Sequence, residues 1–178
     1  GGALNLLFGA GRDVALASGG DLWLSNSIVT TGSLGISSLG DIQMASGTRI
    51  DASSVSLHSL GQDVGRRQRP IRVKTPIIEA SGDNVYLLLE GDTALGGIWA
   101  GKRADITAQG NITGAPGTGK PPIHVAAGSL NLHASGNIGS TELPLGINVG
   151  SLAAGGRNIY LHSIASHLAI QMLRGRNV

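Results

Sequence analysis

A short phrase recurs along this chain: a Gly, up to two further residues, an Asp or Asn, and then Val, Leu or Ile. Seven copies have the following residues at the Asp/Asn position: Asp21, Asp41, Asp63, Asn84, Asn111, Asn137 and Asn158. The first four follow one another at nearly equal intervals, and the last two are separated by the same interval. A period of about 21 residues predicts a solenoid, in which each repeat is too thin to bury its own apolar side and stacks on the next.

Within each repeat, apolar residues alternate with other residues in short bursts, such as Leu22/Leu24, Ile42/Met44 and Leu130/Leu132. Alternation directs one set of side chains inward, as in a β-strand. About three bursts fall in each repeat, and only the segment 164–173 offers even a weak helical pattern. We therefore predict an all-β fold, a right-handed parallel β-helix (β-solenoid) of about eight coils with three short strands per coil. The handedness follows the usual rule for parallel crossovers.

The recurring Asp and Asn residues are expected to share one corner of every coil, with Asp13 and Asp105 as further copies. Short polar side chains are favoured in turns, and equivalent Asn residues can form hydrogen-bonded ladders between stacked strands. A second regularity appears when the sequence is aligned with itself so that Gly65 matches Gly139. Seven residues are then identical to the residues aligned with them: Gly65, Pro70, Ala80, Gly82, Asn84, Tyr86 and Leu87.

Composition supports a packed core and removes several classes of protein. Although 29 of 178 residues are Gly, 41% are hydrophobic and the formal net charge is only +2. The chain has no Cys, which excludes disulfide scaffolds, thiolate zinc sites and a Cys nucleophile. No apolar run approaches the roughly 20 residues of a membrane helix, so we expect no membrane insertion. No motif indicates a cofactor, and none is predicted. Residues 1–178 are interpreted as a single solenoid segment of a larger protein, with an inserted Gly/Pro-rich loop at 114–122.

Residues 130–139 (LNLHASGNIG), Pro144-Leu145, Gly150-Ser151-Leu152 and residues 158–161 (NIYL) resemble the repeat regions of filamentous-haemagglutinin-like exoproteins. These proteins include two-partner-secreted adhesins and contact-dependent inhibition proteins. The resemblance implies a non-enzymatic structural or adhesive shaft, exported through an outer-membrane secretion pore and displayed at the bacterial cell surface. It also implies a glycan or protein receptor on a host or neighbouring cell. Two alternatives stay open: a polysaccharide-active β-helix enzyme (lyase or hydrolase) and an inert spacer.

The most site-like feature is a basic segment, defined here as residues 66–74. Its five cations are Arg66, Arg67, Arg69, Arg72 and Lys74. Alternation directs Ile71 and Val73 inward, which leaves the cations outside and able to attract an anionic glycan. With only 3% aromatic residues, the chain lacks platforms for stacking bases, so a nucleic-acid partner is not expected. The simpler interpretation is a solvated charged corner that discourages aggregation.

Other motifs have plain structural explanations. Asp21, Asp41 and Asp63 can stack within the roughly 5–9 Å that a hydrolytic carboxylate pair needs, but a turn role also explains them. Three histidines, His58, His133 and His162, should point outward, and no third ligand recurs with them, so no metal site is predicted. Residues 114–121 (GAPGTGKP) match a phosphate-binding loop except for their last position, where Pro replaces the expected Ser or Thr. This loop also leads into a strand instead of a helix.

Overall fold

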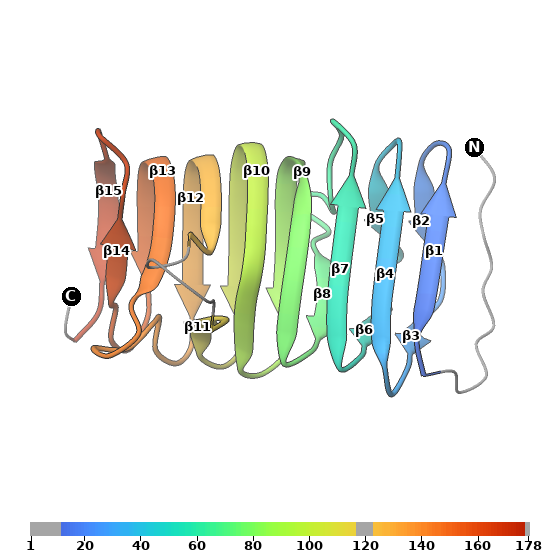
Figure 1. The fold of residues 1–178 in the computed structure, drawn as a ribbon, viewed down its shortest axis with the longest axis horizontal. Helices are drawn as coiled ribbons and strands as arrows, with labels where there is room; N and C mark the ends of the chain where they lie inside the picture. The colour runs from blue at the N-terminus through green and yellow to red at the C-terminus, as the bar shows by residue number, and fades with distance from the viewer. Residues whose placement is uncertain (1–11, 117–122, 177–178) are drawn as a thin grey trace.

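The computed structural model describes residues 12–116 and 123–176. Within these ranges the chain is all-β and contains no helix. The strands pair in parallel, and they stack side by side along the long axis from β1 at one end to β15 at the other (Figure 1). The prediction of a parallel β-solenoid is confirmed, with about eight coils of roughly 20 residues each.

Strands are short in the first coils and longer in the later ones. The early strands are β1 Val14–Ser18, β2 Leu22–Leu24, β3 Ile28–Val29, β4 Ser33–Ser38, β5 Ile42–Met44, β6 Ile50–Asp51, β7 Ser54–Ser59 and β8 Ile71–Lys74. The later strands are β9 Ile77–Leu89, β10 Thr93–Ala108, β11 Ile112–Gly114, β12 Val125–Ala134, β13 Leu145–Gly155, β14 Leu161–Ser163 and β15 Ala169–Arg174. Three short strands per coil is therefore correct only for the early coils. β9, β10, β12 and β13 each continue round a corner of the coil. Between β9 and β10, for example, the register shifts at the corner and pairing resumes at once with Asn84 and Arg103.

The core is a column of aliphatic side chains that repeat at equivalent positions of successive coils. One inward row consists of Ile36, Leu57, Ala80, Ile98, Val125 and Ile147, each at most 1% exposed. No described aromatic residue belongs to this buried core. Strands about 4.8 Å apart bring each side chain onto its equivalents above and below. Burial of such a side chain contributes about 1.5–3 kcal/mol, and most of it comes from contact between coils.

The extra length predicted near residues 114–122 lies between β11 and β12. Leu95 pairs with Gly114 and Ile98 pairs with Val125, so the chain between these two pairings is much longer on the later coil than on the preceding one. Gly114, the first residue of the predicted insertion, is the last residue of β11. Residues 117–122, which carry most of the motif resembling a phosphate-binding loop, lie outside the described residues.

Candidate functional site

The basic segment leaves the solenoid as a tight excursion and then rejoins it. Gly65 has a φ of +73°, and the backbones of Arg66 and Arg69 exchange hydrogen bonds of 3.0 and 2.9 Å. The chain returns to the stack at Ile71, which is fully buried. A Cβ on Gly65 would lie 2.7 Å from the carbonyl oxygen of Tyr86, so both the backbone angle and the close approach require glycine here.

Neighbouring coils neutralise much of the basic segment. Arg72 donates to Oε1 of Glu90 through Nε at 3.2 Å and Nη2 at 2.5 Å. Lys74 lies 3.4 Å from a carboxylate oxygen of Asp51, and Arg66 lies 3.7 Å from one of Asp41.

The two remaining cations differ from these. The guanidinium of Arg69 lies over the ring of Trp23, 5.5 Å from its centroid. Among the described residues, Arg67 alone of the five cations has neither a carboxylate nor a ring partner. Binding of an anionic glycan by this segment stays a prediction, and Arg67 is its most available cation.

The recurring Asp and Asn residues form two ladders at different corners, so the expectation of one shared corner is wrong. In the first ladder, Oδ1 of Asp21 accepts the backbone N–H of Asp41 at 2.9 Å, Asp41 accepts that of Asp63, and Asp63 accepts that of Asn84. The next residue in this row is Arg103, which pairs with Asn84. The three carboxylates do stack, but each has a structural hydrogen bond to the next coil.

The second ladder begins at Asp92, which the sequence pattern missed, and continues through Asn111, Asn137 and Asn158. Oδ1 of Asp92 accepts the backbone N–H of Asn111 at 2.7 Å and also a hydrogen bond from the side-chain amide of Asn111. These two hydrogen bonds lower the pKa of the Asp92 carboxyl. Asn111 then accepts the N–H of Asn137, and Asn158 donates its side-chain amide to Asn137 at 2.9 Å.

The outlying copies of the phrase belong to neither ladder. Asp105 faces outward from β10 and accepts a 2.8 Å hydrogen bond from Arg103. Asp13 accepts two hydrogen bonds from Ser33, one from its hydroxyl and one from its backbone N–H, and these lower the pKa of Asp13.

The offset that places Gly65 on Gly139 relates two local motifs and not two sets of coils. Gly139 has a φ of +64° and begins a second excursion, in which the N–H of Ser140 donates to the carbonyl of Leu143 at 3.0 Å. Val64 is bridged to Val85, whereas Ile138 is bridged to Ile112 and Ile159. The same excursion is therefore used at two different positions of the coil, once with Arg66, Arg67 and Arg69 and once with Ser, Thr and Glu.

The three histidines singled out by sequence are exposed, as alternation predicts. His58 is hydrogen-bonded to the hydroxyls of Ser56 at 2.6 Å and Ser81 at 2.8 Å. Within residues 12–116 and 123–176, no group of three or more His, Asp or Glu side chains could hold a metal ion.

His124, which no sequence motif singled out, is only 1% exposed. Its Nδ1 accepts the N–H of Gly146 at 2.9 Å, and its Nε2 lies 3.2 Å from the carbonyl oxygen of Ala115. A Cβ on Gly114 would lie 2.2 Å from this ring, so Gly114 makes room for it. Its neighbours Ile123 and Val125 suggested an ordinary strand, and the Gly114–His124 pairing was not apparent from either residue alone.

Comparisons with protein-family models, curated proteins and solved structures gave no significant match to this chain. A search of the described residues for a helix long and apolar enough to span a membrane also found none.

Proposed function

We propose that this chain is a non-enzymatic structural and adhesive shaft segment of a large secreted bacterial surface protein. The observation that carries the proposal is the continuous connection between coils. Backbone ladders, two side-chain ladders and one aliphatic core link each described coil to the next. A stack in which every coil supports its neighbours gives a stiff rod that holds its outward residues at fixed spacings.

The adhesive part of the proposal is supported by the two excursions, at residues 66–70 and 140–144. Residues 66–69 and 140–143 of these excursions are exposed, and none of them belongs to the buried core. The first carries three arginines and the second carries Glu142. We propose that such surfaces contact a glycan or protein receptor on a host or neighbouring cell, after export through an outer-membrane secretion pore.

The test uses the purified chain of residues 1–178 coupled to beads. We expect these beads to adhere to cultured cells more than beads carrying a heat-denatured sample, and free chain to compete for adhesion. Absence of specific adhesion would overturn the adhesive part and favour an inert spacer. The same chain would be incubated with acidic and neutral polysaccharides, and release of reducing ends or unsaturated sugars would favour the enzyme instead.

A further inference from the structure

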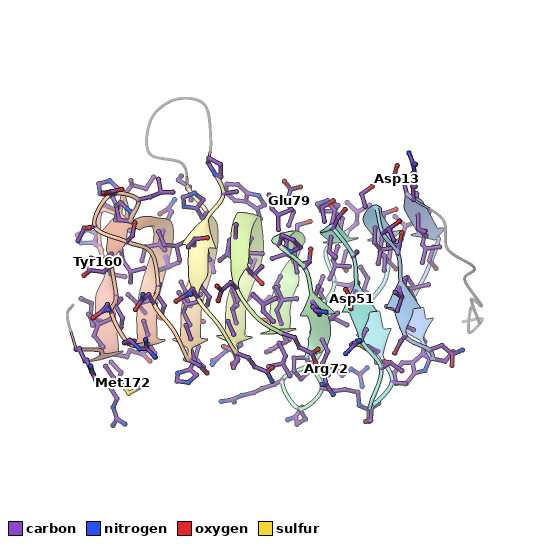
Figure 2. The ribbon with its side chains drawn as sticks, turned by 90° about the horizontal axis from the view of Figure 1, so that it is seen from below. Asp13, Asp51, Arg72, Glu79, Tyr160 and Met172 are labelled. Carbon is purple, nitrogen blue, oxygen red and sulfur yellow. The ribbon has the colours of Figure 1, made fainter. Side chains whose placement is uncertain are left out.

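The outward side of β13 forms the floor of a groove, because its residues there are smaller than those on the neighbouring coils. Ala153 pairs with Asn131 on one side and Met172 on the other, and Gly155 pairs with His133 and Arg174. Two adjoining depressions, of about 470 and 210 Å³, follow this row and share Asn131. Figure 2 shows Met172, at one wall of the groove, pointing away from the ribbon at the red end of the molecule.

Gly155 makes room for the ring of His133 at the side of the groove. A Cβ at this position would lie 3.0 Å from Nδ1 of His133, so the imidazole extends over the space that a side chain would fill. Gly156 and Ser135 extend the larger depression toward the corner, where Arg157 lies. The floor from Ser151 to Gly156 spans five strand steps, which is about 17 Å and long enough for several units of a linear ligand.

The electrostatics of this groove differ from those of the basic segment. Arg157 and Arg174 line the larger depression and are exposed, and no carboxylate lines either depression. Within residues 12–116 and 123–176, neither arginine forms an ion pair. By contrast, Arg66, Arg72 and Lys74 of the basic segment all have carboxylate partners. The groove therefore offers two uncompensated guanidinium groups.

We propose that this groove binds an acidic saccharide, with Arg157 and Arg174 holding a sulfate or carboxylate group. A guanidinium presents paired N–H donors that match such oxyanions. Asn131, His133 and Ser135 supply hydrogen-bonding groups for sugar hydroxyls. This inference rests on the proposed adhesive function and names the ligand class for one of its surfaces.

Two other classes of linear ligand fit the groove less well. A peptide cannot add to β13 as a further strand, because β13 already pairs with β12 and β15 on its two sides. A single-stranded nucleic acid gains much of its affinity from stacking on aromatic rings, and no aromatic residue lines either depression.

The experiment measures binding of a defined heparin hexasaccharide to the chain of residues 1–178 by titration calorimetry. Its desulfated, N-acetylated form, which keeps only the uronate carboxylates, is the less charged probe and should bind more weakly. R157S/R174S should weaken binding more than tenfold, since hydrogen bonds to charged groups contribute about 1.5–3 kcal/mol each. A153F, which fills the smaller of the two depressions without changing the charge, should also weaken binding of the hexasaccharide. The control R12S/K102S removes two cations outside the groove, one of which, Lys102, is paired with Asp83, and should change the affinity less than threefold.

Circular dichroism and thermal unfolding would establish that each variant folds. Equal losses for R157S/R174S and R12S/K102S would mean non-specific attraction and overturn the proposal, as would unchanged binding in A153F. Cell adhesion by the wild-type chain without hexasaccharide binding would overturn the groove proposal alone. Absence of both would overturn the adhesive function as well.

Discussion

At the scale of single residues, the ladders link stability to pH. The Asp92 carboxylate accepts hydrogen bonds from Asn111, which lower its pKa in the folded state. Because the folded pKa lies below the unfolded value near 3.9, this stabilisation is present above about pH 4 and is lost as the pH falls through the folded pKa. D92N should therefore be less stable than wild type at pH 7, with a difference that narrows toward pH 2.

Urea unfolding of the two proteins at both pH values measures this difference. E142Q is the control, because Glu142 makes no hydrogen bond or ion pair within the described residues. A stability difference between D92N and wild type that does not change with pH would contradict the argument.

The buried His124 is the second residue-scale case. In H124L, leucine fills much of the space of the imidazole but leaves the N–H of Gly146 without its acceptor. An unsatisfied buried donor costs about 1–3 kcal/mol, so the urea midpoint should fall accordingly. H162L, at an exposed position, should change the free energy of unfolding by about 0.5 kcal/mol or less. Equal effects from the two substitutions would show that the His124 hydrogen bond contributes nothing.

The basic segment contains its own matched pair of variants. R72S leaves the half-buried Glu90 without its closest cation, whereas R67S breaks no interaction with a described residue. Since Arg72 is partly exposed, we expect R72S to lower the free energy of unfolding by about 1 kcal/mol and R67S to lower it by less than about 0.5 kcal/mol. Added salt should reduce the effect of R72S. An effect of R67S as large as that of R72S would contradict the assigned ion pairs.

At the scale of elements, the turn after β7 and the first excursion each depend on a glycine, for separable reasons. Gly61 and Gly65 both have positive φ, at +76° and +73°, but a Cβ would meet nothing within 4 Å at Gly61 and the Tyr86 carbonyl at Gly65. Backbone strain alone costs about 1–3 kcal/mol, so G61A should lose about this much stability. G65A should lose at least about 1 kcal/mol more, from overlap in a packed region. Equal losses in chemical denaturation would mean that the excursion yields without cost.

The strands could be predicted from the sequence, but their register could not. Alternation identified the strands and the inward residues, because the period of two is set by local geometry. The register could not be predicted in the same way, since coil lengths vary with what each corner contains. Ile78 pairs with Leu95 on the next coil, and Ile98 pairs with Val125 on the coil after that. The number of residues between paired positions is therefore much larger for the second pair than for the first. Asp105 follows Asn84 by about one repeat period in the sequence, yet Asn84 pairs with Arg103 and Asp105 pairs with Tyr86. That interval was therefore a coincidence, and it hid the change from one ladder to the other.

At the scale of the whole molecule, the candidate sites depend on residues that the register brings together. The sequence showed a run of five cations, but not that Asp41, Asp51 and Glu90 meet them from adjacent coils. It also gave no sign of the groove, because small residues are common throughout the chain. Ala153 and Gly155 become a floor only once Asn131, His133, Met172 and Arg174 flank them.

A stack of coils should also be unevenly stable along its axis. β10 pairs with β9 and β12 and is mostly buried or half-buried, whereas β15 pairs only with β13 among the described strands and five of its six residues are exposed. Because stability in a solenoid comes from neighbouring coils, opening the β15 rung disrupts fewer contacts than opening one at β10. In the chain of residues 1–178, amides of β10 should therefore exchange with solvent at least tenfold more slowly than those of β15. Hydrogen exchange followed by NMR measures both, and uniform protection along the axis would show that the chain opens only as one cooperative unit.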